Sequence, residues 1–323
     1  MKTYSYTNQP QHRAALGSAS NTFNVIPEDL AASLTTTQPP ESAPRLESET
    51  APQADMDQAR AEALNAKLQR GVAQLTELIA ATADRRMPYT PLIRAIRSRS
   101  HGYVFRVWSP TTGRMMHLQS TGEYRGMTVL DQSGCYRNVR EGFGMPKDLT
   151  EAIAESEGIK HPYDRFAGEN AMMSCDFLCD KLEGGHLAID YKPSDLAQRK
   201  RVQDKFRIMA LAFATVGIRH VVVTEKDLDP VLTANLDLLY PFTAGIDAPP
   251  LPNASLMRAG ESLRLLLCGG KLSIYDAAVR IEQAFVCGTG RLVRTALWMI
   301  ARHHWPVDLN RPVHPDCPLH FLN

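Results

Sequence analysis

The chain has 323 residues, which at a prior of about 150 residues per domain leaves room for two domains and a tail. Lys and Arg number 36 against 35 Asp and Glu, so the formal net charge is +1 and no overall basic excess marks a nucleic-acid-binding protein. The hydrophobic fraction of 44% excludes a wholly disordered or fibrous chain. We therefore expect a globular protein whose charges must be interpreted locally.

Two further features of the sequence concern its compartment. The longest uncharged apolar stretch, residues 208–218, is shorter than the ~20 residues that a membrane-spanning helix needs. Residues 1–11 are polar and do not resemble a secretory signal, so we expect a cytoplasmic protein with no membrane segment. Six Cys residues in so long a chain do not suggest a disulfide framework, and we expect them to be reduced.

The N-terminal part changes composition near residue 57. Residues 31–60 are rich in Pro, Ser, Thr and Gln, which cannot bury enough surface to offset the entropy of ordering, so residues 1–57 are predicted to be a disordered tail. Beyond it, large apolar residues recur at the spacing of a helical stripe: Leu64, Leu68, Val72, Leu75 and Ile79. We predict an amphipathic helix over 58–87 that packs on its own domain; a coiled-coil contact with a partner is the alternative.

After residue 88, short β-type runs alternate with turns. Strands are predicted at residues 103–108, 172–179, 187–191 and 220–224. A helix over residues 194–216 is predicted between the last two strands. This order predicts a mixed α/β domain over residues 88–245.

The last part of the chain is predicted to be helical. Three Pro residues within 247–253 are typical of an extended linker. Helices are predicted beyond it at 256–268, 273–285 and 290–303, and short extended segments near 305–309 and 318–321. Three helices with a tight turn before the third and an extended tail predict a winged-helix-like domain over residues 246–323.

An acidic motif spans two of the predicted strands. Asp176 lies on one strand, and Asp190 and Lys192 lie on the next, which is the spacing of PD-(D/E)xK nucleases. Residues i and i+2 of a strand share a face, so Asp190 and Lys192 point the same way while Tyr191 points oppositely. If the strands pair, two carboxylates can hold Mg²⁺ and Lys192 can stabilise charge on a scissile phosphate. The alternative is a solvent-facing strand end with exposed or paired charges.

Two neighbouring features add to this motif. Glu123 offers a third carboxylate on a short helix that Ser120 or Thr121 could cap. The helix predicted over 194–216 carries cations suited to phosphate contacts: Arg199, Lys200, Arg201, Lys205 and Arg207. The alternative for this helix is an ordinary solvated face.

Taken together, several segments resemble the TnsA endonuclease subunit of heteromeric cut-and-paste transposons, within the PD-(D/E)xK nuclease superfamily. They are Ser120-x-x-Glu123, Cys175-Asp-Phe177, Ile189-Asp-Tyr-Lys-Pro-Ser194 and residues 220–228, and the resemblance covers about residues 117–240. It implies a restriction-endonuclease-like mixed sheet flanked by helices. The family's catalytic set also implies Glu123, Asp176 and Lys192 here, with Asp190 where the family commonly has Gln.

The expected site follows from the motif and the resemblance together. The candidate catalytic residues are Glu123, Asp176, Asp190 and Lys192. The candidate ligands for Mg²⁺, for which Mn²⁺ can substitute, are Glu123, Asp176, Asp190 and Tyr191. The candidate DNA-binding residues are Arg199, Lys200, Arg201 and Lys205. Glu225 is expected either to hold the catalytic residues in place without contacting the metal or to be structural.

The resemblance implies a function as well. It implies a Mg²⁺-dependent DNA endonuclease that cuts the non-transferred strand near the 5′ side of transposon ends, with a TnsB-like transposase and a TnsC-like ATPase regulator as partners. One alternative is a stand-alone PD-(D/E)xK restriction or junction-resolving nuclease. The other is a catalytically inactive DNA-binding scaffold, against which the intact Asp176, Asp190 and Lys192 argue.

Overall fold

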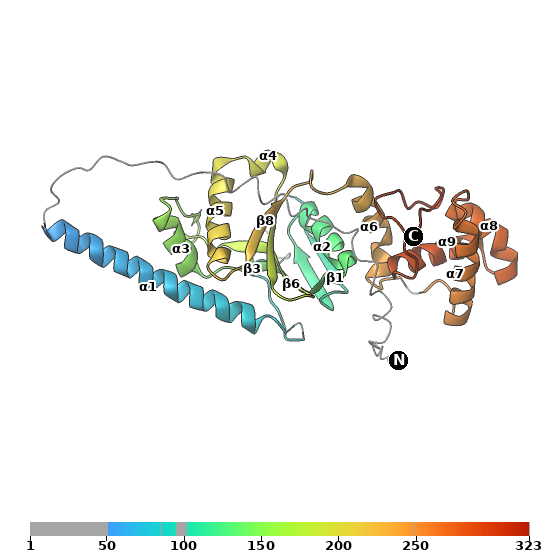
Figure 1. Cartoon of the computed structure of the whole chain (residues 1–323), viewed down its shortest axis with the longest axis horizontal. Helices are drawn as coiled ribbons and strands as arrows, with labels where there is room; N and C mark the ends of the chain where they lie inside the picture. The colour runs from blue at the N-terminus through green and yellow to red at the C-terminus, as the bar shows by residue number, and fades with distance from the viewer. Residues whose placement is uncertain (1–50, 85, 95–101, 248, 323) are drawn as a thin grey trace. The chain divides into compact units, whose positions relative to one another are not determined.

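The computed structural model describes residues 51–84, 86–94, 102–247 and 249–322 (Figure 1). Most of the predicted tail therefore lies outside the described residues. Helix α1 runs over Ala51–Ala81, so the helix predicted over 58–87 exists with different bounds. It begins within the predicted tail, because a Pro at position 52 is tolerated in the first helical turn and Ala and Gln favour helix. It ends at Ala81, after which the Thr82 hydroxyl donates to the Leu78 carbonyl (2.7 Å).

A four-stranded mixed sheet with the order β3-β6-β7-β8 forms the centre of the α/β part. Its strands are β3 (Tyr136–Gly144), β6 (Ser174–Lys181), β7 (His186–Tyr191) and β8 (Arg219–Val223). β6 is antiparallel to β3 and to β7, whereas β8 is parallel to β7. The sequence predicted the last three strands but not β3, because Asn138, Arg140 and Glu141 are buried and hide its apolar alternation.

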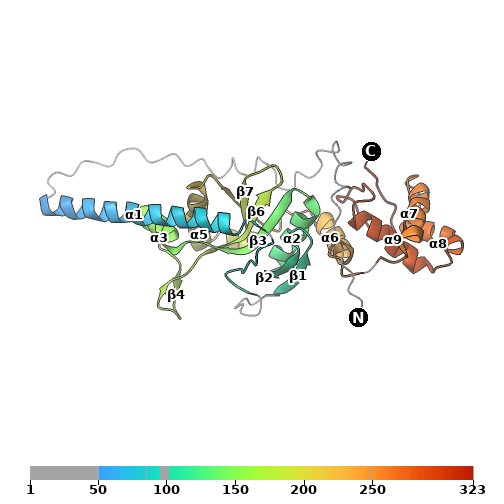
Figure 2. The same ribbon diagram turned by 90° about the horizontal axis from the view of Figure 1, so that it is seen from below.

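Helices α1, α3 (Lys147–Ser156) and α5 (Lys200–Ala214) build one core with this sheet. Figures 1 and 2 both show α1 beside α3. The two helices approach closely at Gly71, where an added Cβ would lie 2.5 Å from the Leu149 backbone nitrogen. Leu75 and Ile79 of α1 belong to this core, so the prediction that the helix packs on its own domain is confirmed.

The helix predicted over 194–216 is two helices, α4 (Ser194–Ala197) and α5. Arg199 adopts an extended backbone (φ −71°, ψ 130°) between them. The predicted single helix is divided because only α5 has an apolar face to bury. Its buried residues are Ile208, Met209, Ala212 and Phe213, whereas α4 buries none. The capping residues near 194 therefore start a separate short turn.

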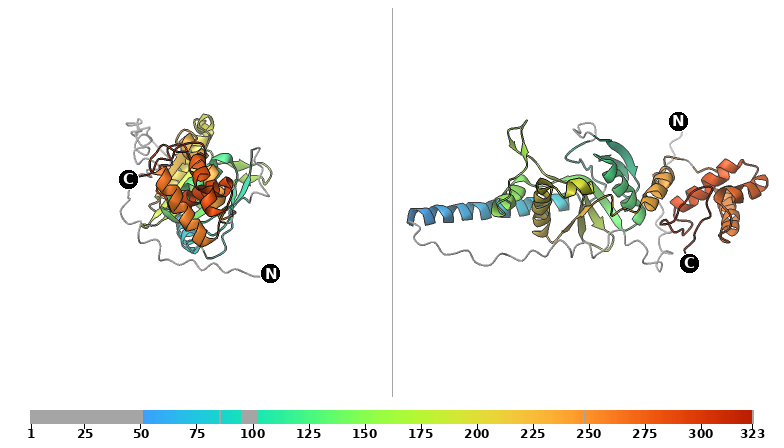
Figure 3. Two further views of the ribbon diagram at one scale, coloured as in Figure 1. Left: turned by 90° about the vertical axis from the view of Figure 1, so that its right-hand side faces the viewer. Right: turned by 90° about the horizontal axis from the view of Figure 1, so that it is seen from above.

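On the other side, α2 (Thr121–Ser133) packs against β7. Its Gly126 lies against the Tyr191 ring, and Ser120 caps it by accepting a hydrogen bond from the Glu123 N–H (3.1 Å), which decides between the two predicted caps, Ser120 and Thr121. Strands β1 (Phe105–Ser109) and β2 (Arg114–Leu118) form an antiparallel ribbon beside α2 (Figure 3). A second small ribbon consists of β4 (Tyr163–Asp164) and β5 (Glu169–Asn170).

The C-terminal part contains α6 (Pro230–Thr243), α7 (Asn253–Leu267), α8 (Ile274–Phe285) and α9 (Thr289–Ala301), of which the last three cluster together (Figure 3). These three helices were predicted, and the Ser273 hydroxyl caps α8 by accepting a hydrogen bond from the Asp276 N–H (3.0 Å). The extended tail segments pair at Val307 and Phe321. Helix α6 was not predicted, because it is apolar on most sides and contains Pro241.

Buried Asn235 on α6 donates to the Leu309 and Arg311 carbonyls and accepts from the Val313 N–H, each at 2.8 Å. Helix α6 contacts α2 as well as α9, so it connects the α/β part to the C-terminal helices.

The predicted mixed sheet flanked by helices is confirmed by the strand order and by the helices that pack on the sheet. The restriction-endonuclease-like and winged-helix-like details, and boundaries at 88–245 and 246–323, stay predictions.

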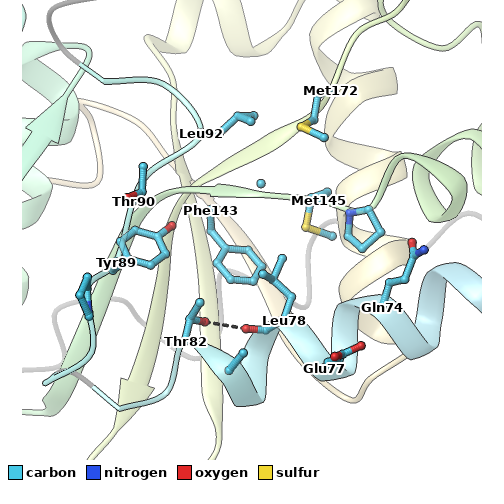
Figure 4. A pocket seen from close by; sticks show the side chains of 14 residues that line it. Gln74, Glu77, Leu78, Thr82, Tyr89, Thr90, Leu92, Phe143, Met145 and Met172 are labelled. Carbon is cyan, nitrogen blue, oxygen red and sulfur yellow. Dashed lines mark hydrogen bonds between the residues drawn. The ribbon is translucent and has the colours of Figure 1, made fainter.

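An apolar cavity of about 550 Å³ lies where α1 ends against β3. Figure 4 shows Leu78, Phe143 and Met145 gathered in it, with Tyr89 and Leu92 from the following segment on the other side. The Tyr89 hydroxyl donates to the Glu141 carbonyl (2.9 Å), which holds this segment to the sheet. In the residues that the structure describes, no helix is long and apolar enough to cross a bilayer.

Candidate active site

Asp176 and Asp190 lie opposite each other on β6 and β7. The register pairs Phe177 with Ile189, which places these two carboxylates side by side on the sheet. The Asp176 N–H donates to Asp190 Oδ1 (3.2 Å), and the Tyr191 N–H donates to Asp176 Oδ2 (2.7 Å). The predicted pairing of these strands and the convergence of the two acids are therefore confirmed.

A cavity of about 200 Å³ opens where these strands meet α5. Asp176, Asp190 and Lys192 line it from the sheet, and Arg201 and Lys205 line it from α5. The Lys192 N–H donates to the Val223 carbonyl (2.9 Å), which extends the β7–β8 pairing past Tyr191. Lys192 thus shares a cavity with Asp190, as the i, i+2 spacing predicted.

Tyr191 turns its ring onto α2, where it packs against Gly126 and meets Phe177 edge-on, with ring centroids 6.0 Å apart. Burial raises the pKa of the Tyr191 phenol well above its usual range. Its ring is therefore a packing group, and a contribution of Tyr191 to a metal site is limited to its backbone.

Glu123 caps its own helix. Its Oε2 accepts from the Gln119 N–H (2.7 Å), and its Oε1 accepts from the Ser120 hydroxyl (3.1 Å). Burial raises the pKa of Glu123, although these two hydrogen bonds oppose the shift, and the charge of Asp190 adds to it. Glu123 does not line the cavity. The structure brings its charge close to the two aspartates while its oxygens serve the helix cap.

His220 was not predicted as part of this site, and Lys205 was predicted as a DNA-binding residue but not as a partner of the two aspartates. His220 Nε2 lies 2.7 Å from Asp190 Oδ2, and both side chains are 2% exposed. The Phe213 ring stacks on the His220 ring with centroids 6.0 Å apart. Burial alone would raise the pKa of Asp190, but the His220 hydrogen bond and the Lys205 charge outweigh it and lower that pKa.

Lys205 supplies positive charge to the cavity, together with Lys192 and Arg201. Burial opposes its protonation, yet the negative charges of Asp190 and Asp176 raise its pKa above the usual range. The sequence held a signal for this position, because Lys205 is three and four residues from the buried Ile208 and Met209 and so shares their helix face. For His220, the signal was a polar residue at the start of the apolar run Val221–Val223.

The remaining predicted residues lie around this centre. Arg199 precedes α5 and is exposed, and Lys200 is exposed and pairs with Asp204 (2.9 Å). Glu225 accepts from the backbone N–H of Ser194 (2.8 Å) and from its hydroxyl, which lowers the Glu225 pKa. Glu225 thereby fixes the chain two residues after Lys192, a structural role.

The donor atoms at the site fit a hard divalent cation. Among the described residues, none donates a hydrogen bond to Asp176 Oδ1. Burial, followed by the charges of Asp190 and Glu123, raises the pKa of Asp176 well above its usual range. A cation bound to these oxygens would relieve that repulsion, and carboxylate oxygens are the ligands that Mg²⁺ prefers.

A second group of possible ligand atoms shares Asp190. Atoms of Cys175, Asp190 and His220 lie within 4.8 Å of one another. The Cys175 Sγ donates to the Phe177 and Ile189 carbonyls (3.0 and 3.2 Å), and burial raises its pKa well above the usual range. The protonated thiol is thus a packing group, as expected for a buried strand cysteine, and all six Cys are free.

Comparison with known proteins adds one relative. The chain is 32% identical over 154 residues to the transposon Tn7 transposition protein TnsA of Escherichia coli. The match covers 47% of this chain and 56% of that protein, so the chain spans about half the length of the curated relative. No protein-family model matches the chain.

Proposed function

We propose that this chain is the endonuclease subunit of a transposase, which hydrolyses phosphodiester bonds at transposon ends. The observation that carries the proposal is the meeting of Asp176, Asp190 and Lys192 at one cavity between the sheet and α5. The identity of 32% to the Tn7 protein TnsA supports it. Because only about half of that relative is matched, its activity, substrate and partners are part of the proposal.

The metal that we assign to this site is Mg²⁺, for which Mn²⁺ can substitute. Asp176 and Asp190 would hold it, with Tyr191 contributing through its backbone and Glu123 through its negative charge. When bound, the cation would supply Lewis-acid stabilisation of the scissile phosphate and activation of the attacking water.

The protein's own cations have separate tasks in this proposal. Lys192, which directly follows β7 and lines the cavity, would stabilise the negative charge that develops on the phosphate. Lys205 balances the two aspartates and, with His220, keeps Asp190 ionised and fixed. The exposed cations Arg199, Lys200 and Arg201 at the start of α5 would contact phosphates along the DNA.

The family resemblance supplies the finer points. From it we propose cleavage of the non-transferred strand near the 5′ side of each end, beside a TnsB-like transposase and under a TnsC-like ATPase regulator. The cytoplasmic location stays a prediction.

A strand-specific cleavage assay tests the proposal. The full chain and its transposase partner are incubated with Mg²⁺ and end-labelled transposon-end duplex, and the products are sized on a sequencing gel. We expect one cut near the 5′ side, slowed at least ~100-fold by Asp176→Asn and by Lys192→Met. The exposed charges Asp195 and Lys271, which have no role in the proposed site, provide controls, and their variants Asp195→Asn and Lys271→Met should retain activity within a few-fold.

Three outcomes would contradict this assignment. Wild-type rates in the Asp176→Asn variant would exclude the proposed site. Efficient cutting by the chain alone, away from transposon ends, would identify a stand-alone nuclease. DNA binding without cleavage in Mg²⁺ or Mn²⁺, with the partner present, would identify an inactive scaffold.

A further inference from the structure

The β1–β2 ribbon has one packed face and one exposed face. Its packed face includes Met116 and Leu118, which are fully buried, and Phe105, whose ring stacks on Tyr124 with centroids 4.8 Å apart. The Tyr240 hydroxyl donates to the Trp108 carbonyl (3.0 Å), which fixes the ribbon to α6 as well. The packed face of the ribbon is therefore held in place by α2 and α6.

The exposed face presents two directly opposed cross-strand pairs, Arg106 with His117 and Trp108 with Met115. We call these four residues the ribbon face. Arg106 is exposed, and Trp108 and Met115 are each 39% exposed. The solvent-exposed Trp, Met and Arg side chains of this strand pair are residue types that are enriched at binding interfaces.

Positive charge gathers on and beside the ribbon face. Among the described residues, Arg106 is exposed on it, and Arg94 and Arg114 lie close enough to act on His117, although Arg114 also pairs with buried Glu141. The pKa of His117 is lowered by burial and then, against the opposing charge of buried Glu141, by the guanidinium groups of Arg106, Arg94 and Arg114. A polyanion is the partner that such a surface attracts.

Strand β2 of the ribbon leads directly into the segment that positions Glu123. Strand β2 ends at Leu118, and the N–H of the next residue, Gln119, donates to Glu123 Oε2 (2.7 Å). Because the carboxylates of the site repel phosphates, DNA needs cationic contacts beside it to remain bound across it. The ribbon face lies one residue away from the segment that positions Glu123.

We propose that the ribbon face binds double-stranded DNA next to the cleavage site, with Arg106 on backbone phosphates and Trp108 and Met115 against the groove. A two-stranded ribbon is one of the elements that the major groove admits. The inference rests on the proposed function for its choice of DNA as the polyanion, and it adds the surface that holds the duplex beside the acidic cavity.

Binding measured without cleavage tests this inference. Fluorescence anisotropy of a labelled transposon-end duplex is followed in EDTA over a range of NaCl concentrations, with the full chain and its Arg106→Gln, Arg106→Lys and Trp108→Ala variants. We expect Arg106→Gln to weaken binding about 3- to 10-fold and to reduce the salt slope by about one. Arg106→Lys should keep the slope, and Trp108→Ala should weaken binding without changing the slope.

Arg60 on α1 provides the matched control, because its side chain is 73% exposed and distant in sequence from the ribbon. Arg60→Gln should bind like wild type, and thermal melting should be unchanged in all variants. The inference is overturned if Arg106→Gln and Trp108→Ala bind like Arg60→Gln, or if the wild type does not bind duplex. Ribbon variants that bind DNA normally but lose a protein partner would also overturn it.

The outcome is separable from that of the proposed function. If the wild type binds the duplex through the ribbon face but cuts nothing, the ribbon inference stands and the nuclease proposal fails. If the wild type cuts transposon ends while the ribbon variants bind normally, the nuclease proposal stands and the ribbon inference fails.

Discussion

The contact between Gly126 and Tyr191 predicts how a single methyl group would disturb the site. A Cβ at residue 126 would lie 2.2 Å from Tyr191 Cε2, 2.3 Å from Cζ and 2.6 Å from the hydroxyl oxygen. The ring cannot simply move aside, since it is 9% exposed and packed against Phe177. Gly126→Ala should therefore displace β7, the strand that carries Asp190 and precedes Lys192.

The magnitude follows from two opposing effects. Overpacking a core typically costs 1–3 kcal/mol, and overlap with three ring atoms places this case at about 2–3 kcal/mol. Replacing Gly by Ala inside a helix returns up to about 1 kcal/mol. The net loss of stability should be about 1–2 kcal/mol, or roughly 2–8 °C in melting temperature. Cleavage should fall at least ~10-fold, because misplaced reacting groups lose rate steeply.

Calorimetry and the cleavage assay check this prediction, and Gly122 on the same helix is the matched control. A Cβ at Gly122 would lie 3.7 Å from the Tyr191 Cβ, an ordinary contact, so Gly122→Ala should be neutral or slightly stabilising. Tyr191→Leu removes the clashing ring atoms and should make Gly126→Ala less harmful in a double-mutant cycle. If Gly126→Ala melts and cuts like Gly122→Ala, the argued packing of α2 on β7 is wrong.

The remaining predictions concern buried charges. Arg140→Met leaves the carboxylate of Asp180 buried without its guanidinium partner and should lower the free energy of unfolding by about 3–5 kcal/mol in urea titrations. Burial raises the pKa of Asp131 to about 6, so stability should fall as pH rises from about 4 through 6, and Asp131→Asn should flatten that slope in melts at pH 4–8. Lys205→Met should lower the melting temperature in EDTA and less so in Mn²⁺, which supplies the missing positive charge, whereas Lys200→Met should change neither melt. A pH-independent melt, or equal effects of the two Lys variants, would contradict these assignments.

The sequence was most informative where one local rule decides the structure. The i, i+2 spacing of Asp190 and Lys192 determines a shared face, and the hydrogen-bonding side chain of Ser120, one of the two predicted caps, determines where α2 begins. Both predictions depend on neighbours within four residues, and both are confirmed.

The sequence was least informative where buried charged residues are stabilised by partners that lie far away in the sequence. Strand β3 carries buried Arg140 and Glu141, whose partners are Asp180 on β6 and Arg114 on β2, far apart in sequence. Without those partners in view, the segment has no apolar alternation to indicate a strand. His220 was not predicted as a site residue for the same reason, because only the pairing of β7 with β8 brings it next to Asp190.

The dependence of cleavage rate on Mg²⁺ concentration tests the central claim most directly. Wild type and Asp190→Gln are compared in single-turnover cleavage of transposon-end DNA, with EDTA as the zero point. The account predicts no cleavage in EDTA, saturation by Mg²⁺ in the wild type, and a curve displaced to higher Mg²⁺ in Asp190→Gln, because one negative oxygen ligand is lost. Cleavage in EDTA, or identical curves for the two proteins, would contradict a metal-dependent site at these carboxylates.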